Sequence, residues 1–222
     1  MTTLKNKVAI VTGSSKGIGA QIALSLAAAG AKTVINYAND DTAANDIVSQ
    51  IKSAGGEAIA VQADVSNTKQ VEAMFDTTID SFGKPDILVN SAGIMINKPI
   101  SETTDEDFDR IFSINVKGTF NTLREAATKL NDGGRVVNLS STTTRMLLPS
   151  YGTYCATKGA VDQLTRIFSK EVGARGITVN AVSPGPTDTE LFHEGKADDT
   201  VERLASMSPF NRIGEPVDIA RV

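Results

Sequence analysis

The segment Lys7-Val-Ala-Ile-Val-Thr-Gly-Ser-Ser-Lys-Gly-Ile-Gly19 is the stretch of sequence that decides the fold. Residues 7–11 are almost continuously apolar, which is typical of a strand that is covered on both faces. Glycines follow at positions 13, 17 and 19, and residues 17–29 are rich in alanine and leucine, as expected of a helix closed by Gly30. This order of strand, glycine turn and helix predicts the first unit of a dinucleotide-binding sheet.

The same rhythm of short strands and longer helices continues along the chain. We predict further strands at 33–36, 58–62, 86–89, 135–139 and 177–182, and helices at 41–54, 68–82, 108–130 and 154–174. Alternating strands and helices imply a parallel sheet with right-handed crossovers and helices on both faces. The predicted fold class is therefore α/β, a Rossmann-type doubly wound parallel sheet in three α/β/α layers.

The 222 residues are predicted to form a single domain over 1–222. From residue 184 onward, prolines, glycines and charged residues surround a predicted helix at 199–207. We therefore expect residues 184–213 to form a flap over the site. The sequence then stops within a further helical pattern at 215–222.

Composition excludes several classes of partner. The net charge is −4 and the sequence has no basic patch, so nucleic acid is not an expected partner. No apolar run is long enough to cross a membrane, and the first residues lack the apolar stretch of a signal peptide. Cys155, the single cysteine, cannot form an internal disulfide. We expect a soluble, cytoplasmic protein, and we read the acidic residues at 102–109 as the start of a helix, capped by Thr104 and Asp107, rather than as a metal site.

The glycine turn is suited to a dinucleotide. Gly13 permits a tight turn, Gly17 lets the backbone approach a pyrophosphate, and Gly19 lets the helix pack closely on the strand. The helix N-terminus offers free N–H groups and the positive end of its dipole to the phosphates. The spacing differs from the commoner G-x-G-x-x-G, so a glycine-rich turn without a ligand is the alternative.

The end of the second strand bears on the choice between the two nicotinamide cofactors. Asn36, Tyr37 and Ala38 occupy this segment, and no acidic residue follows until Asp40. An acid at the strand end would hold the ribose 2′-hydroxyl and repel a 2′-phosphate. Lys16 adds a positive charge nearby, so both features favour NADPH over NADH. The alternative for Lys16 is an ordinary solvated surface lysine.

Two further strands end in polar or small residues. Asp64 follows the third predicted strand, where it could accept a hydrogen bond from an adenine amino group or cap the next helix. Asn90, Ser91, Ala92 and Gly93 follow the fourth strand, and small residues there let the chain pass close beneath a flat ligand.

A tyrosine and a lysine predict proton-transfer chemistry. Tyr154 and Lys158 lie four residues apart on a predicted helix and therefore share one face. The usual tyrosine pKa of ~10 is too high for exchange near neutrality, but one close ammonium lowers it by roughly 1–3 units, and an oxidised nicotinamide would add a second positive charge. Ser141 follows a strand and can donate to a substrate oxygen that gains negative charge. Asn115 could hold a water molecule that connects Lys158 to solvent, or it could be a satisfied core amide.

Taken together, these motifs resemble the short-chain dehydrogenase/reductase family over essentially the whole chain. The matching elements, in order, are Thr12-Gly-Ser-Ser-Lys-Gly-Ile-Gly19, Asn90-Ser-Ala-Gly93, the segment around Asn115, Ser141, Tyr154-Cys-Ala-Thr-Lys158 and Pro184-Gly-Pro-Thr-Asp-Thr189. The resemblance implies a catalytic tetrad of Asn115, Ser141, Tyr154 and Lys158. It also implies that Lys158 bonds the nicotinamide ribose and that Pro184, Gly185 and Thr187 or Thr189 lie along the nicotinamide.

The complete set of expected cofactor-binding residues combines this resemblance with the strand-end analysis. It comprises Gly13, Ser15, Lys16, Gly17, Ile18, Gly19, Asn36, Tyr37, Ala38, Asp64, Val65, Asn90, Ala92, Gly93, Tyr154, Lys158, Pro184, Gly185, Thr187 and Thr189.

The chain departs from the family pattern in two places. Ser91 stands where the family usually has asparagine, and the family's seventh strand, which helps to build a subunit interface, has no counterpart before Val222. The resemblance also implies a homo-oligomer, a tetramer or a dimer. We therefore expect an NADP(H)-dependent oxidoreductase that interconverts a ketone and a secondary alcohol, similar to 3-oxoacyl-carrier-protein reductases and to sugar or ketone reductases. The alternative is a non-catalytic dinucleotide-binding regulator of the same fold.

Overall fold

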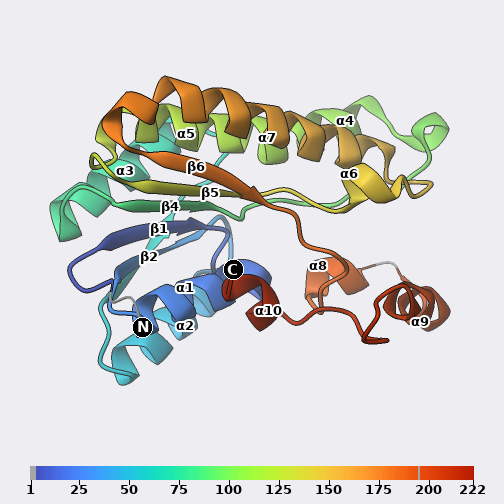
Figure 1. Cartoon of the computed structure of the whole chain (residues 1–222), viewed down its shortest axis with the longest axis horizontal. Coiled ribbons are helices and arrows are strands. Elements are labelled where there is room, and N and C mark those ends of the chain that lie inside the picture. The colour runs from blue at the N-terminus through green and yellow to red at the C-terminus, as the bar shows by residue number, and fades with distance from the viewer. Residues whose placement is uncertain (1–3, 195) are drawn as a thin grey trace.

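A single parallel sheet forms the centre of the computed structural model, which describes residues 4–194 and 196–222 (Figure 1). The strands lie side by side in the order β3-β2-β1-β4-β5-β6, and every neighbouring pair is parallel. Their bounds are β1 Val8–Thr12, β2 Lys32–Tyr37, β3 Ala58–Gln62, β4 Ile87–Asn90, β5 Arg135–Leu139 and β6 Thr178–Val182. The predicted doubly wound α/β fold class is confirmed.

Helices cover both faces of this sheet. In Figure 1, α1, α2 and α10 lie below the strands, and α3, α5 and α7 lie above them. The short helices α8 and α9 lie to one side, beyond the end of β6. The helix bounds are α1 Gly17–Ala28, α2 Asp41–Ser53, α3 Thr68–Phe82, α4 Asp105–Phe112, α5 Gly118–Lys129, α6 Thr143–Met146, α7 Gly152–Glu171, α8 Glu190–His193, α9 Asp198–Ser206 and α10 Pro216–Ala220.

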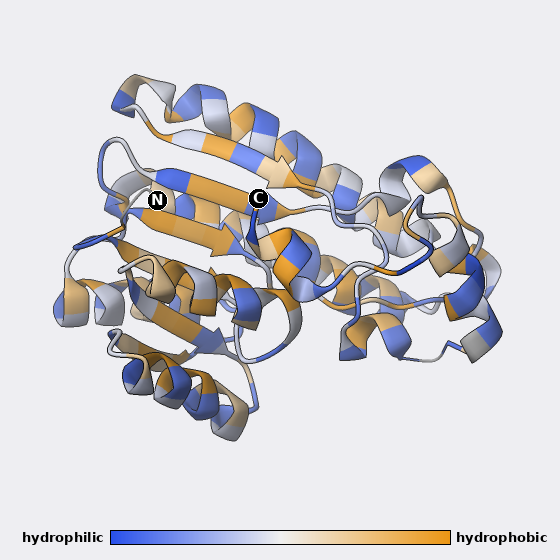
Figure 2. Cartoon of the chain, turned by 60° about the horizontal axis from the view of Figure 1, so that its bottom comes forward, coloured by the Kyte–Doolittle hydropathy of each residue, from blue (hydrophilic) through white to orange (hydrophobic). Residues whose placement is uncertain are grey.

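The first strand contributes to the cores on both sides of the sheet. Ala9 and Val11 pack in the cluster with α1 and α2, whereas Ile10 packs in the cluster with α3, α5 and α7. All five residues of β1 are buried. This explains the uninterrupted apolar run in the sequence, because alternate side chains of a strand point to opposite faces. The central strands are correspondingly hydrophobic along most of their length in Figure 2.

Two predicted helices begin earlier than the sequence analysis placed them. The helix predicted at 108–130 begins at Asp105, because Thr104 and Asp107 form the expected capping box. It also contains a π-helical turn, Ser113–Lys117, between α4 and α5. The helix predicted at 154–174 runs over Gly152–Glu171 and is followed by a separate 3-10 turn, Gly173–Arg175.

Side-chain hydrogen bonds fix the turns that follow β1 and β2. The hydroxyl oxygen of Thr12 accepts from the backbone N–H groups of Ser91 and Ala92, at 3.1 Å each. The Asn36 side-chain oxygen accepts from the backbone N–H of Gly13 at 3.1 Å. Chain crossovers leave β1 and β4 in opposite directions, so the turns after these strands border a crevice where α/β proteins bind ligands.

Within the described residues, no helix combines the length and the apolar character that crossing a membrane requires.

The close contact at Gly19 gives a test of how tightly the turn is packed. A Cβ atom on Gly19 would lie 2.4 Å from the backbone oxygen of Gly13, where no flexible side chain can give way. We expect Gly19→Ala to lower the free energy of unfolding by about 1–3 kcal/mol. The matched control is Gly159→Ala in α7, where a Cβ meets nothing within 4 Å and should add about 0.5–1 kcal/mol of stability.

Urea titrations followed by circular dichroism measure both changes. Equal midpoints for the two variants would contradict the packing described for the glycine turn.

Candidate active site

A cleft of about 680 Å³ opens at the carboxyl ends of the strands. This volume lies in the range of small-molecule and cofactor sites. Most of the predicted site residues line it, and they come from segments far apart in the sequence. The predicted residues in its wall are Gly13, Ser15, Lys16, Gly17, Ile18, Gly19, Ala92, Gly93, Ser141, Tyr154, Lys158, Pro184, Gly185, Thr187 and Thr189.

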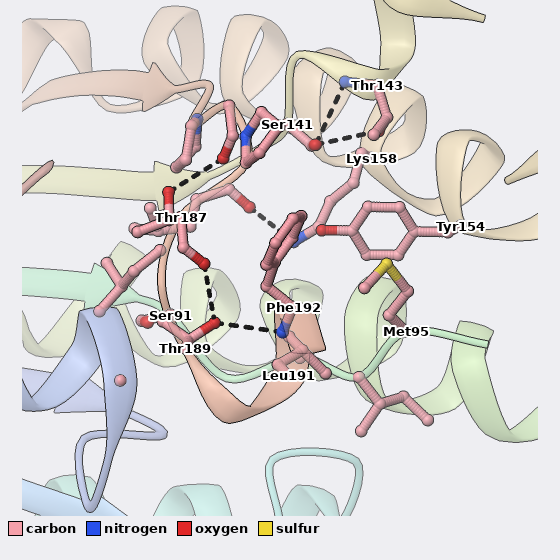
Figure 3. A pocket seen from close by; sticks show the side chains of 18 of the residues that line it. Ser91, Met95, Ser141, Thr143, Tyr154, Lys158, Thr187, Thr189, Leu191 and Phe192 are labelled. Atoms are coloured by element: carbon pink, nitrogen blue, oxygen red, sulfur yellow. Dashed lines mark hydrogen bonds between the residues drawn. The ribbon is translucent and has the colours of Figure 1, made fainter. Parts of the chain in front are cut away.

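Tyr154 and Lys158 both face this cleft from the first turns of α7 (Figure 3). The Lys158 ammonium lies 5.6 Å from the centre of the Tyr154 ring. It donates a hydrogen bond of 2.8 Å to the backbone oxygen of Leu139, at the end of β5. The spacing of four residues thus brings the two side chains to one face, as predicted.

The electrostatics of this pair differ from the prediction. Burial raises the pKa of Tyr154 to about 12, although a hydrogen bond with Ser141 acts to lower it. Burial also lowers the pKa of Lys158 to about 8, against a smaller opposing effect of the Asp162 charge. The expectation that Lys158 would depress the pKa of Tyr154 is therefore wrong for the protein without cofactor, because desolvation disfavours the charged form of both groups.

Ser141 follows β5 and lies beside Tyr154 in the wall of the cleft, where the two side chains share a hydrogen bond (Figure 3). Its hydroxyl oxygen accepts hydrogen bonds from the backbone N–H of Thr143 at 3.2 Å and from the Thr143 hydroxyl at 2.9 Å. Because the Ser141 oxygen accepts these two bonds, its own proton is the one that it can donate, either to the Tyr154 oxygen or to a substrate oxygen. Thr143 was missing from the sequence analysis, and its hydroxyl could have been suspected only from its position two residues after Ser141.

Asn115 lies beside the cleft, in the π-helical turn Ser113–Lys117, and is buried. Its side-chain amide bonds the backbone N–H and C=O of Ile94, at 2.9 Å each, and donates to the hydroxyl of Thr157 at 3.1 Å. The amide is therefore a satisfied buried group, the alternative left open by the sequence. A Cβ on Gly93 would lie 3.3 Å from the Asn115 oxygen and 3.7 Å from the Lys158 nitrogen, so these groups are close neighbours.

The glycine turn has the backbone geometry that a phosphate site needs. Gly13 and Gly17 have φ angles of 61° and 59°, which side-chain-bearing residues rarely adopt. A Cβ on Gly13 would lie 2.7 Å from the backbone of Ala92. Helix α1 begins after Lys16 without a side-chain cap, so no side chain occupies its N-terminal N–H groups.

Lys16 itself pairs with an acid that the sequence analysis did not consider. Its ammonium lies 2.8 Å from the Glu190 carboxylate, at the start of α8. This ion pair raises the pKa of Lys16, chiefly through the hydrogen bond to Glu190.

Several residues predicted to bind the cofactor have side chains already engaged with the protein. Asn36 is buried, and its amide donates to the backbone oxygens of Val61 in β3 and of Ala63 just after it, and accepts from the Gly13 N–H. Asn90 is buried beneath the cleft, where its amide bonds Asn138 at 2.8 Å and Thr122 at 2.7 Å. Both side chains thus hold strands and turns together, and a cofactor contact of either residue stays a prediction.

The remaining strand-end residues also lie outside the wall of the cleft. Val65 is buried in the core, where a Cβ on Gly118 would clash with its side chain at 2.5 Å, and its contact with the cofactor stays a prediction. Asp64 accepts from the N–H and hydroxyl of Ser66, and Asn67 caps α3, so the alternative role of Asp64 as helix cap is excluded. Tyr37 ends β2, and Ala38 follows it.

The segment that follows β6 forms a further wall of the cleft. Thr187 is buried, and Thr189 caps α8 by accepting from the N–H of Phe192 at 3.2 Å. Phe192 and the apolar residues around it were not predicted, because nothing in the local sequence marks which loop residues meet across a cleft. The lining residues that the sequence did not single out are Ile94, Met95, Leu139, Ser140, Thr142, Thr143, Tyr151, Pro186, Glu190, Leu191, Phe192, Glu194 and Leu204, and Ser91, Met146 and Leu148 also line the cleft.

Among the described residues, no group of three or more histidine, cysteine, aspartate or glutamate side chains is placed to hold a metal ion.

Comparison with known proteins agrees with this site. A sequence model described as enoyl-(acyl carrier protein) reductase matches residues 13–222. The short chain dehydrogenase/reductase dmxR18 of Cryptosporiopsis sp. (strain 8999) is 45% identical and covers 99% of this chain and 88% of its own. The NADPH-dependent aldehyde reductase-like protein of Arabidopsis thaliana, a chloroplastic protein, is 46% identical and covers 97% of this chain and 85% of its own.

A solved structure extends the agreement to three dimensions. The short chain dehydrogenase from Burkholderia cenocepacia J2315 in complex with NADP has a TM-score of 0.92 and is 36% identical, covering 98% of this chain and 89% of that one. The chain belongs to the short-chain dehydrogenase/reductase family. It is a nicotinamide-dependent oxidoreductase, as predicted, and not a non-catalytic regulator of the same fold.

Proposed function

We propose that the protein is an NADPH-dependent reductase that converts a ketone into a secondary alcohol, with Tyr154 as the proton donor. The observation that carries this proposal is that Ser141, Tyr154 and Lys158 line the same cleft as the glycine turn. Binding of a dinucleotide and proton transfer can therefore take place side by side.

The residues of the cleft fit a dinucleotide. The positive φ angles at Gly13 and Gly17, together with the uncapped start of α1, make a cradle of backbone N–H groups. A side chain at position 13 would clash with the Ala92 backbone, so the turn needs glycine there. We propose that this cradle holds the pyrophosphate and that Lys16 binds the 2′-phosphate. When bound, NADPH supplies the hydride. Support for NADP as the cofactor comes from the Arabidopsis relative and from the Burkholderia structure with NADP.

Tyr154 is suited to donate a proton to a ketone oxygen. A pKa raised to about 12 keeps the phenol protonated at neutral pH, which is the form that an acid must have. Ser141 can donate its hydroxyl proton to the same oxygen as negative charge develops there. Lys158, whose pKa is about 8, is a stronger acid than Tyr154 and can return a proton to the phenolate.

Asn115 is proposed to act as a positioning residue. Its two hydrogen bonds to Ile94 hold the segment after β4, which lines the cleft and carries Gly93 beside Lys158. In this role Asn115 sets the distance between that segment and the ammonium, without touching the substrate itself.

The Tyr154 end of the cleft is the proposed place for the substrate. It is bordered by apolar side chains, and residues 184–213, the proposed flap, supply three of them: Leu191, Phe192 and Leu204. Such a lining favours a ketone or 3-oxoacyl compound with an apolar body over a sugar, because buried hydroxyl groups would need hydrogen-bond partners there.

We also propose that the protein works in the cytoplasm as a homo-oligomer, a dimer or a tetramer. The support for assembly is a second, apolar groove between α4, α5 and α7, in which Phe120 and Ile167 are 46% and 59% exposed. Contiguous exposed apolar side chains of this kind are typical of protein interfaces. The support for the compartment is the lone cysteine, Cys155, which fits a reducing environment.

The role of Tyr154 is tested by Tyr154→Phe, which removes the hydroxyl and retains the ring. We expect reduction of ketones to fall by at least about 1000-fold, of the order that a general acid contributes, while the dissociation constant for NADPH changes less than about twofold. Stopped-flow loss of NADPH absorbance measures the first quantity, and fluorescence titration measures the second. Near-full turnover in the Tyr154→Phe variant would exclude the proposed mechanism.

Cofactor preference is tested by combining Tyr37→Asp with Lys16→Ala. The new carboxylate can accept from a ribose 2′-hydroxyl, and the loss of the ammonium removes the attraction for a 2′-phosphate. The ratio of kcat/KM for NADPH to kcat/KM for NADH should fall at least tenfold, about the effect of 1.4 kcal/mol. If the ratio stays as in the parent protein, neither residue sets the preference.

A further inference from the structure

The ion pair between Lys16 and Glu190 spans the cleft from one wall to the other. Lys16 immediately precedes α1, and Glu190 is the first residue of α8. Both residues line the cleft, and their charged atoms are 2.8 Å apart. Within the described residues, this is the one ion pair that joins the glycine turn to the segment following β6.

The residue before Glu190 lies close to the glycine turn beneath this pair. A Cβ on Gly17 would lie 3.4 Å from the methyl group of Thr189, so the turn and the residue that precedes α8 are near neighbours. Thr189 also caps α8 through its bond to the N–H of Phe192. The Glu190 side chain itself is largely exposed, so its carboxylate can move away from Lys16 while the start of α8 stays close to the turn.

Lys16 is surrounded by negative charge. Besides the hydrogen bond to Glu190, the charges of Asp40 and Glu194 act on its ammonium and help to raise its pKa. Asp40 caps α2 by accepting from the N–H of Ala43, so it is held in place and forms no ion pair with Lys16. An incoming anion thus meets an ammonium whose charge is largely balanced by one movable carboxylate, that of Glu190.

We infer that Glu190 is a residue that determines cofactor specificity, because its carboxylate competes with the 2′-phosphate of NADPH for the ammonium of Lys16. This inference rests on the proposed role of Lys16. When NADPH binds, Lys16 pairs with the 2′-phosphate instead of with Glu190. The ion pair between α8 and the glycine turn is then lost. NADH has no 2′-phosphate, so it binds with the pair intact.

The exchange has a consequence at the other end of the cleft. Leu191 and Phe192 follow Glu190 directly in α8, and both line the cleft near Tyr154 (Figure 3). Release of Glu190 therefore removes the ion pair that holds the helix with part of the substrate wall to the glycine turn. The Glu190 carboxylate therefore has two effects. It weakens the binding of NADPH, and it links NADPH binding to the wall of the cleft where the ketone binds.

The decisive variant is Glu190→Gln, which keeps the size of the side chain and removes its charge. Dissociation constants for NADPH and for NADH are measured by fluorescence titration of the purified protein, with no substrate present. Because an exposed ion pair contributes up to about 1 kcal/mol, which is a factor of about five in a dissociation constant, we expect the constant for NADPH to fall about two- to fivefold. The constant for NADH should change less than about 1.5-fold, and the difference should shrink at 1 M salt, where charges are screened.

Glu194→Gln is the matched control, because Glu194 acts on Lys16 without forming an ion pair with it. It should tighten NADPH binding less than Glu190→Gln does. Equal tightening of NADPH and NADH by Glu190→Gln, or weaker binding of NADPH, would overturn the inference.

Lys16→Ala separates this inference from the proposed function. In the Lys16→Ala background, Glu190→Gln should no longer improve NADPH binding relative to NADH. If Lys16→Ala alone leaves the ratio of the two dissociation constants unchanged, the proposed role of Lys16 fails. If Lys16→Ala lowers the preference for NADPH while Glu190→Gln in the parent protein has no effect, the competition alone is wrong.

Discussion

A buried ammonium is the constraint on which the rest of the site depends. Lys158 lines the cleft, its ammonium donates to the backbone oxygen of Leu139, and burial lowers its pKa to about 8. Because folding lowers this pKa from 10.5, the folded chain holds the proton more weakly than the unfolded chain does. Lys158 therefore costs stability below about pH 8, and stability is regained as the pH rises toward 10.5. Such a cost is typical of residues that are kept for function.

The fold accommodates this charge by placing polar backbone and rigid elements around it. Strand β5 ends at Leu139, so its carbonyl can turn to the ammonium, and the spacing on α7 sets Tyr154 over the same point. The π-helical turn brings Asn115 to the segment after β4, where Gly93 leaves room between the two groups. Lys158 is thus more acidic than Tyr154, which favours proton transfer from the Lys158 ammonium to a Tyr154 phenolate. On this account, catalysis in the reductive direction uses a protonated tyrosine and a lysine that replenishes it.

The sequence predicted the sheet and the location of the site well, because both follow from local patterns. Apolar runs such as residues 8–12 mark buried strands, and positive φ angles require glycine at positions 13 and 17. What the sequence could not predict depends on contacts between distant segments. The bond between the Asn36 side chain and the glycine turn was not foreseen, and Glu190 was overlooked although it pairs with Lys16. The raised pKa of Tyr154 was likewise missed, since desolvation is decided by packing and not by spacing along a helix.

Measuring the pKa of Lys158 in the protein without cofactor tests this account most directly. The chain can be labelled with ¹³C-lysine and titrated by NMR, and the Lys158→Met variant identifies the signal. We expect this signal to titrate with a midpoint near 8, below the ordinary value of 10.5. A midpoint near 10.5 would mean that the ammonium is solvated, and the proton-donating arrangement with Tyr154 described above would then be wrong.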